Sequence, residues 1–140
     1  MSTTGYLDSS AVIALLLDEP GRTAPVRDAL AGCNFLATSM VAYAECRAAL
    51  AAARRQERID VGAGAAARER LDAIWFELER VSVTEDCVRR AGALSDQRGL
   101  RGFDALHLAS ALVLGDDTTF LTWDSRLAAA ARLEGMATPL

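Results

Sequence analysis

The segment around Asp104 places one carboxylate at the start of an otherwise apolar helix. From Ala105 to Leu114 nearly every residue is Ala or Leu, a pattern that predicts a helix buried on most sides. An unpaired carboxylate in such a place costs considerable free energy, so Asp104 needs a partner. That partner could be a helix N-terminus, an arginine or a metal ion. The positions of the other acids bear on this choice.

Three further acids are placed after predicted strands. Asp8 comes directly after the first strand, Glu45 lies about one turn inside the helix after the second, and Asp124 follows the fourth. Ligands of parallel α/β sheets bind outside the carboxyl ends of the strands. The helix that Asp104 opens must run back along the sheet, so it begins near the same edge. We expect these four acids to converge there, and Asp116 to lie at the opposite end.

Converging carboxylates repel one another, and this repulsion points to a cation. Two charges about 4 Å apart interact by ~4 kcal/mol at the effective dielectric near a protein surface. Such a cluster either takes up protons or holds a divalent ion. Hard oxygen ligands suit Mg²⁺ or Mn²⁺, and water polarised by such an ion can attack a phosphodiester. The acids therefore favour metal-assisted hydrolysis but do not name the substrate.

Strands and helices alternate along the chain. The predicted strands are Gly5–Leu7, Phe35–Ala37, Val81–Val83, Thr118–Thr122 and a short last one at Met136–Thr138. The predicted helices are Ala11–Leu17, Thr23–Gly32, Met40–Arg55, Ala63–Arg80, Glu85–Leu94, Ala105–Leu114 and Arg126–Leu133. This order predicts an α/β fold, a three-layer parallel sheet with helices on both faces, interrupted by one helical hairpin. We expect residues 1–140 to form a single domain.

Each acid also has an ordinary structural explanation. Asp8 and Asp124 could cap the helices that follow them, and Asp104 could be an acid favoured by the helix macrodipole. Glu45 could form a surface ion pair with Arg47. These alternatives stay open at the level of the sequence.

Several hydroxyl residues are expected to serve as helix N-caps. Ser9 and Ser10 precede one apolar helix, and Thr38 and Ser39 precede the next predicted helix after a strand. Thr84 stands directly before an acidic first turn and is expected to cap that helix. These assignments set the predicted starts of the elements.

Composition narrows the possible functions. All fifteen basic residues are arginine, which excludes a P-loop and lysine-based covalent or acid–base chemistry. The net charge of −4 argues against binding nucleic acid by bulk charge alone. The three cysteines are far apart and odd in number, which is typical of free thiols in a reducing compartment. With neither a signal peptide nor a membrane-length apolar run recognised, a cytoplasmic protein is expected.

Four segments together resemble the PIN-domain nucleases and, more narrowly, the VapC toxins of toxin–antitoxin pairs. They are Tyr6–Ser10, the helical Glu45, Phe103–Ala109 and Phe120–Asp124, in the right order and spacing. The resemblance covers the whole chain. It implies a Mg²⁺- or Mn²⁺-dependent endoribonuclease that hydrolyses RNA, forms a homodimer and is neutralised by a small VapB-like antitoxin. Such antitoxins often insert a basic side chain among the acids.

The resemblance also implies roles for residues that match the family's motifs. The catalytic positions would be Asp8, Glu45, Asp104 and Asp124. Asp8 and Asp104 would ligate the metal directly. Glu45 would ligate it either directly or through water, and Asp124 would reach it through water. Ser10 or Thr122 would orient a metal-bound water.

The basic loop before Asp104 and the single histidine have two interpretations each. Arg98 and Arg101 could hold a substrate phosphate or simply solvate the loop. His107 lies one helical turn after Asp104 on the same face. A packed or hydrogen-bonded core histidine is favoured there over a general base.

Two other enzyme classes and one binding module compete with the nuclease interpretation. A haloacid-type phosphatase needs a second Asp two residues after the first, where this chain has Ser10, and a phosphorylated receiver domain needs a lysine. The non-enzymatic alternative is a PIN-like module that binds RNA or protein without cutting. It gains support only if no metal binds.

Overall fold

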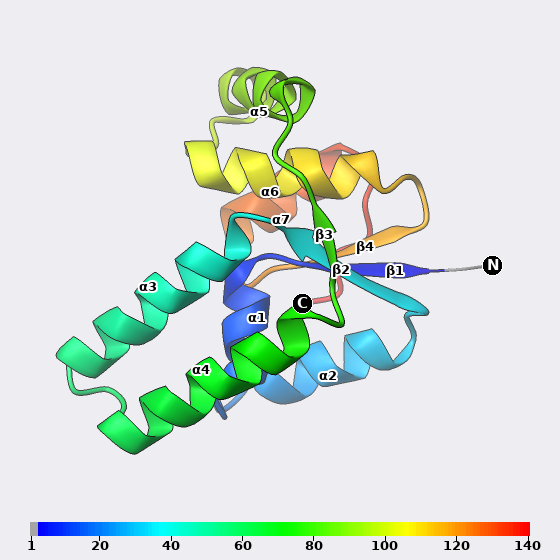
Figure 1. Ribbon diagram of the computed structural model, residues 1–140. Coiled ribbons are helices and arrows are strands. Elements are labelled where there is room, and N and C mark those ends of the chain that lie inside the picture. Colours follow the sequence, from blue (N-terminus) through cyan, green and yellow to red (C-terminus); the bar gives the residue numbers. More distant parts are fainter. Residues whose placement is uncertain (1–2) are drawn as a thin grey trace.

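A parallel sheet forms the centre of the computed structural model, and the described residues 3–140 contribute four strands to it (Figure 1). These strands are β1 Thr4–Leu7, β2 Phe35–Ser39, β3 Glu79–Val81 and β4 Thr118–Leu121. Their spatial order is β3-β2-β1-β4, so β1 is paired on both sides. All carboxyl ends therefore meet at one edge, as the sequence predicts.

Helices cover both faces of this sheet. They are α1 Ser9–Leu16, α2 Thr23–Ala31, α3 Ala42–Arg55, α4 Val61–Trp75, α5 Glu85–Arg98, α6 Gly102–Val113 and α7 Ser125–Leu133. In Figure 1, α5, α6 and α7 lie above the sheet and α1 to α4 lie below it. The three-layer α/β prediction is confirmed, and α3 and α4 pack together as the expected helical hairpin.

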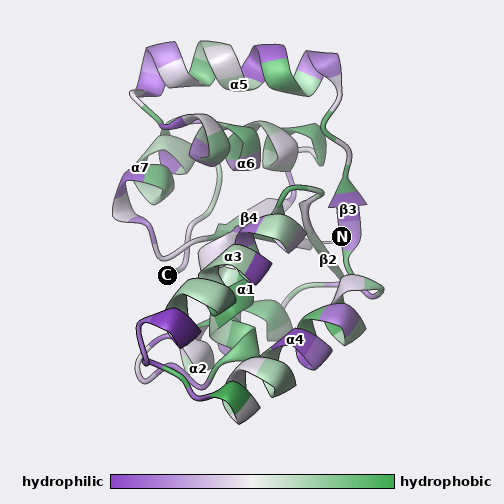
Figure 2. Cartoon of the chain, turned by 60° about the vertical axis from the view of Figure 1, so that its left-hand side comes forward, coloured by the Kyte–Doolittle hydropathy of each residue, from purple (hydrophilic) through white to green (hydrophobic). Residues whose placement is uncertain are grey.

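Side chains of the central strands alternate between two hydrophobic cores. Tyr6 and Phe120 belong to the core under α5, α6 and α7. Leu7 and Leu121, one residue further on in each strand, belong to the core that α1 to α4 cover. Figure 2 shows hydrophobic residues concentrated in α6 and around α1, whereas the outer helix α5 carries many hydrophilic ones. A sheet buried on both faces is thus positioned rigidly beneath the acids.

The end of the helical hairpin differs from the prediction. α4 ends at Trp75 rather than near Arg80, and β3 spans Glu79–Val81 rather than Val81–Val83. Leu78 is 3 % exposed and continues the apolar periodicity beyond the helix, which is why the local sequence favours a longer helix. Parallel pairing with β2 fixes the strand at its observed place.

β2 is also longer than predicted, because Thr38 and Ser39 extend the strand instead of capping a helix. The buried Thr38 hydroxyl donates a hydrogen bond to the Leu7 carbonyl at 2.7 Å. Ser39 pairs with Val81 of β3. α3 consequently begins at Ala42, later than predicted and without a side-chain cap hydrogen bond.

Among the described residues, the N-cap side chains that accept a backbone hydrogen bond are three acids and one threonine, namely Asp8, Asp60, Asp124 and Thr84. Asp8 caps α1 in place of Ser9 or Ser10, because its carboxylate accepts a hydrogen bond from a backbone N–H of the first turn. Thr84 and Asp124 cap α5 and α7, as predicted. Two of the acids of interest therefore have a structural task as well.

Three remaining expectations concern the end of the chain, the cysteines and membranes. The strand predicted over Met136–Thr138 is reduced to one bridge between Thr119 and Ala137. The cysteines among the described residues are free thiols, as predicted. No helix in this described part of the chain is long and apolar enough to cross a membrane.

Candidate active site

The acids singled out from the sequence lie at the edge where the strands end. Asp8 follows β1, Asp124 follows β4, and Glu45 is in the first turn of α3, the helix after β2. Asp104 is in the first turn of α6. Arg101 contacts both Asp104 and Asp124, so α6 and α7 begin side by side. The predicted positions at the carboxyl edge are confirmed for these residues.

Asp8 is the most enclosed of these acids, at 5 % exposed. Its Oδ1 accepts hydrogen bonds from the Ser10 hydroxyl at 2.6 Å and the Ala11 N–H at 3.0 Å. Its Oδ2 accepts one from the Thr122 hydroxyl at 2.5 Å. Burial raises the pKa of the Asp8 carboxyl, and these bonds and the neighbouring His107 offset only part of the effect. A nearby cation would therefore stabilise ionised Asp8.

Arg101 bridges the two more exposed acids. Its Nε is 3.2 Å from Asp104 Oδ2, and its Nη2 is 3.9 Å from Asp124 Oδ2. Asp124 Oδ1 accepts the N–H groups of Arg126 and Leu127 at 2.9 and 3.1 Å, which confirms Asp124 as an N-cap. The Arg101 side chain is 83 % exposed. It can therefore leave the acids at little cost, because exposed ion pairs contribute weakly.

Glu45 is held by a serine and the histidine, and within the described structure it forms no ion pair with Arg47. Its Oε1 accepts the Ser9 hydroxyl at 2.6 Å and lies 2.6 Å from His107 Nε2. Burial raises the pKa of the Glu45 carboxyl, but the hydrogen bonds from His107 and Ser9 together with the electrostatic effect of His107 outweigh it, so the pKa lies below its ordinary value. Ionised Glu45 thus adds stability above the unfolded pKa, which is lost as pH falls through the lowered value.

Ser10 and Thr122 join the two strand ends that carry Asp8 and Asp124. The Ser10 hydroxyl donates to Asp8 and accepts the Trp123 N–H at 2.9 Å. The Thr122 hydroxyl donates to Asp8 and accepts the Asp124 N–H at 3.0 Å. Both hydroxyl protons are therefore given to the Asp8 carboxylate. The role of Ser10 or Thr122 in orienting water stays a prediction.

Only one of the two arginines considered for phosphate binding lies at the acids. Arg98 pairs instead with Glu134 at 3.0 Å, and both side chains are mostly buried. Between them and the site, Gly99 adopts a φ of 66°, the left-handed conformation that glycine favours, and so ends α5. The chain then turns to present Arg101. A phosphate role for Arg98 would require the Glu134 pair to break.

The donor atoms of the site suit Mg²⁺ or Mn²⁺, although they are not gathered around one point. Within residues 3–140, no three His, Cys, Asp or Glu side chains lie close enough together to hold an ion. Each acid nevertheless keeps an oxygen with acceptor capacity to spare among the described hydrogen bonds: Asp8 Oδ2, Glu45 Oε2, Asp104 Oδ1 and Asp124 Oδ2. Since Mg²⁺ binds through few carboxylates and several waters, these residues fit it once Arg101 moves away.

Replacing Arg101 by Ala is expected to tighten Mn²⁺ binding. The guanidinium and the cation compete for Asp104 and Asp124, and an exposed ion pair is worth about 0–1 kcal/mol, so the affinity should rise by up to about fivefold. Calorimetric titration with MnCl₂ measures this. Arg132→Ala is the matched control, because Arg132 bonds Thr138 far along α7. Unchanged or weaker binding in Arg101→Ala would show that the arginine does not compete with the ion.

Two residues belong to the site although their sequence context indicates only a strand and a helix cap. The Tyr6 hydroxyl lies 2.7 Å from His107 Nδ1, and Ser9 contacts Glu45. Tyr6 stands two residues before Asp8, and residues i and i+2 of a strand share a face. That spacing is the signal that could have identified it. No sequence pattern links Ser9 to a residue 36 positions away.

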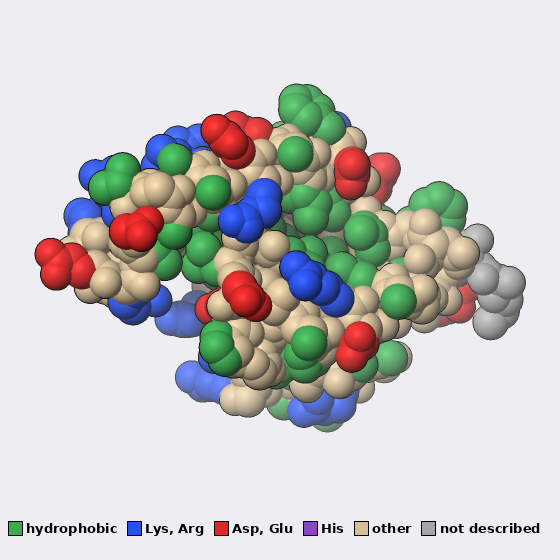
Figure 3. Space-filling model, turned by 90° about the horizontal axis from the view of Figure 1, so that it is seen from below, with side chains coloured by type: hydrophobic (Ala, Val, Ile, Leu, Met, Phe, Trp, Pro, Cys, Tyr) green, Lys and Arg blue, Asp and Glu red, His purple; other side chains and the backbone are tan. Residues whose placement is uncertain are grey.

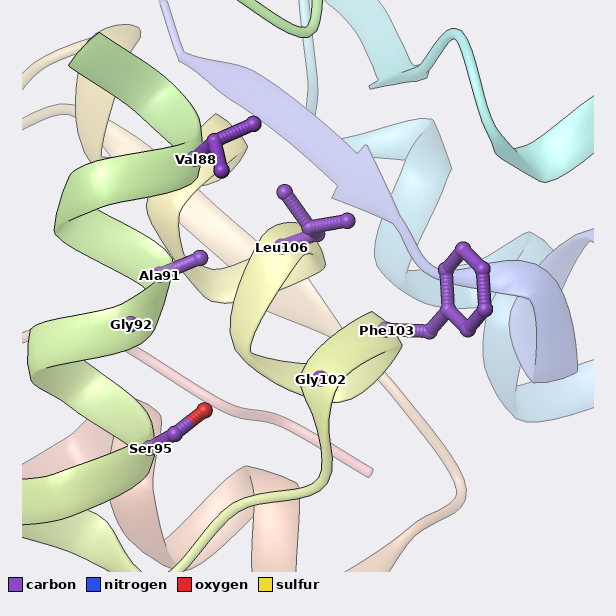
Figure 4. Close-up of a pocket in the computed structure, with 7 residues that line it drawn as sticks. All are labelled: Val88, Ala91, Gly92, Ser95, Gly102, Phe103 and Leu106. Carbon is purple, nitrogen blue, oxygen red and sulfur yellow. The ribbon is translucent and has the colours of Figure 1, made fainter. Parts of the chain in front are cut away.

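An apolar hollow lies between α5 and α6, away from the acids (Figure 4). It is lined by Val88, Ala91, Gly92, Ser95, Gly102, Phe103 and Leu106. Val88 and Leu106 face each other across it, whereas Phe103 points away from α5 and is 59 % exposed. Because these lining residues carry no titratable side chain, the hollow offers contact area rather than catalysis.

The face that α2 and α4 present has a mixed charge pattern. Figure 3 shows arginine and acidic side chains interspersed across it. Binding of a phosphate backbone by bulk charge needs a patch of one sign. This face therefore does not suit RNA binding, and the acidic edge with Arg101 is the better candidate surface.

The chain belongs to the PIN domain family, because residues 5–133 match it. Among proteins of similar sequence is Ribonuclease VapC45 of Mycobacterium tuberculosis (strain CDC 1551 / Oshkosh). It is 39 % identical over 132 residues, which are 93 % of this chain and 90 % of that protein. The predicted family is therefore confirmed.

Solved structures with the same fold include a toxin–antitoxin pair. PAE2754 from Pyrobaculum aerophilum has a TM-score of 0.72 and 22 % identity, over 97 % of this chain and 83 % of that chain. A toxin–antitoxin complex from Klebsiella pneumoniae has a TM-score of 0.69 and 20 % identity, over 97 % of this chain and 98 % of that chain. At these identities the likeness establishes the fold.

Proposed function

We propose that the protein is a Mg²⁺- or Mn²⁺-dependent endoribonuclease and the toxin of a toxin–antitoxin pair. The observation that supports this most directly is the set of four acids at the carboxyl edge of the sheet, each with a carboxylate oxygen that can accept a further contact. The similarity to Ribonuclease VapC45 supports RNA as the substrate. The protein would act in the cytoplasm, where that substrate is found.

The four acids are proposed to bind the ion in different ways. Asp8, Glu45 and Asp104 are proposed to ligate it, and Asp124 to reach it through water. The ion, when bound, supplies a Lewis acid and an activated water for attack on phosphorus. The chain's own contribution is to fix the carboxylates: two hydroxyls hold Asp8, and a serine and a histidine hold Glu45. Fixed ligands lose less entropy when the ion binds.

Arg101 is proposed to change partners when the ion binds. In the structure its guanidinium neutralises part of the charge of Asp104 and Asp124. With an ion bound beside these acids, the exposed arginine would be available to a phosphate of the RNA, which it can bind through two N–H groups. Arg98 is the weaker candidate for this role, because Glu134 already holds it.

A VapB-like antitoxin and a second copy of the chain are the proposed protein partners. The Klebsiella pneumoniae structure is a toxin–antitoxin complex. The apolar hollow between α5 and α6, with the half-exposed Val88 and Phe103, offers area that a partner could bury. Light scattering on the chain alone tests the homodimer, for which the mass should be about twice 14.9 kDa.

Titration with MnCl₂ separates the nuclease from a binding module of the same fold. Protein stripped with EDTA is expected to release or absorb heat that saturates, because the carboxylate oxygens with remaining acceptor capacity would bind the ion. A module that binds RNA or protein without cutting needs no ion. A flat titration would favour that alternative over the nuclease.

A further inference from the structure

A chain of buried and partly buried hydrogen bonds connects the centre of the sheet to the Glu45 carboxylate. The Tyr6 hydroxyl lies 2.7 Å from His107 Nδ1, and His107 Nε2 lies 2.6 Å from Glu45 Oε1. The Ser9 hydroxyl donates to the same oxygen at 2.6 Å. These four residues come from β1, α6, α3 and α1, so the network joins helices on opposite faces of the sheet. The positions of the four acids alone do not predict any of these contacts.

The chemistry of Glu45 fixes the role of the His107 nitrogen that faces it. Ionised Glu45 can only accept, so Nε2 must donate to it. The Tyr6 side chain is fully buried, so its hydroxyl needs a hydrogen-bond partner. His107 Nδ1 is that partner, at 2.7 Å. With a proton on Nε2, the ring holds Glu45 on one side while Tyr6 holds the ring on the other.

The same geometry argues against a general base at this position. His107 is 2 % exposed and both of its ring nitrogens are engaged. Its ring is further fixed edge-on against Tyr6, at 5.9 Å between centroids, and Tyr6 stacks on Phe120 at 5.3 Å. A histidine held in this way cannot accept a proton from a water at the acids. His107 can therefore only position Glu45, the residue to which its Nε2 is bonded.

The contact with His107 restricts the orientation of the Glu45 side chain. Its side chain is 29 % exposed and has three rotatable bonds, so it would otherwise sample several orientations. Oε1 takes two donors, whereas Oε2 takes none among the described hydrogen bonds. The carboxylate is thus fixed through one oxygen and open at the other.

We propose that His107, itself fixed by Tyr6, is a positioning residue that holds Glu45 through Oε1 and leaves Oε2 as the atom available to the divalent ion. The proposal rests on the proposed function in its assignment of Glu45 as a metal ligand. Partners of this kind behind metal ligands are worth about 10–100-fold in metal affinity.

The tautomer can be observed directly, because the chain contains one histidine. Untagged protein labelled with ¹⁵N-histidine gives one pair of ring nitrogens in a long-range ¹H–¹⁵N spectrum. We expect a pattern in which Nε2, the nitrogen that faces Glu45, carries a proton in metal-free protein. Tyr6→Phe should disturb that pattern, whereas Tyr43→Phe, which removes the same hydroxyl from a tyrosine bonded to Asp72, should not. An Nδ1–H tautomer, or no response to Tyr6→Phe, would overturn the proposal.

A double-mutant cycle on Mn²⁺ affinity tests the connection to the ion. His107→Leu should weaken binding by about 10–100-fold in the wild-type background and by little in Glu45→Gln, because it acts only through Glu45. An equal loss in both backgrounds would overturn the positioning role while leaving Glu45 as a ligand. Unchanged affinity in Glu45→Gln alone would overturn the ligand assignment in the proposed function, and the positioning role with it.

Discussion

Asp8→Asn is expected to reduce RNA cleavage by at least about 10²–10³-fold and to make the metal-free protein more stable at neutral pH. The loss of activity follows because a metal ligand supplies several kcal/mol of charge stabilisation in the transition state. The amide keeps an oxygen for the Ala11 N–H, so α1 keeps its cap. Cleavage rates and thermal unfolding in EDTA measure the two effects.

The gain in stability should depend on pH with a definite sign. Burial raises the pKa of folded Asp8, so the stability of the wild type is greatest below the unfolded pKa and falls as pH rises through the folded value. The amide that replaces this carboxyl in the variant does not titrate, so the difference in unfolding temperature should grow with pH and vanish in acid. A variant less stable than the wild type at neutral pH would contradict the burial argument.

Asp104→Asn is expected to abolish cleavage to a similar degree, about 10²–10³-fold, with little change in stability. Its ion pair with Arg101 is largely exposed and contributes about 0–1 kcal/mol. The matched control is Asp116→Asn, an exposed acid beyond the other end of α6. That variant should cleave RNA like the wild type.

Two outcomes would contradict this assignment. Asp104→Asn with full activity would remove Asp104 from the site, and unfolding of the variant would show that its carboxylate has a structural task instead. Equal losses in Asp104→Asn and Asp116→Asn would mean that net charge, rather than position, determines activity.

The sequence predicts the fold well where local pattern and tertiary structure agree. The apolar runs of β1 and β4, the Thr84 cap and the apolar helix after Asp104 are all found as predicted. The errors occur where residues distant in sequence determine the local secondary structure. Thr38 and Ser39 have the composition of a helix cap, yet β3, about 40 residues later, extends the strand through them.

The candidate site likewise has features that the sequence predicts and features that depend on distant residues. The location of the acids at one edge of the sheet follows from the rule that parallel strands end at one edge, so it could be predicted. The expected gathering of the four acids around one point is not found among the described residues. The bridging of Asp104 and Asp124 by Arg101 could not, because it depends on how the turn at Gly99 directs the chain. Likewise the contact of Tyr6 with His107 spans 101 positions.

The most direct test of the central claim is RNA cleavage by one EDTA-stripped preparation to which Mg²⁺ or Mn²⁺ is added back. Total RNA is incubated with wild type, Asp104→Asn and Asp116→Asn, with and without each ion. We predict cleavage by wild type and Asp116→Asn only when an ion is present, and none by Asp104→Asn. Cleavage in EDTA, or equal cleavage by Asp104→Asn, would contradict a metal-dependent nuclease built on these carboxylates.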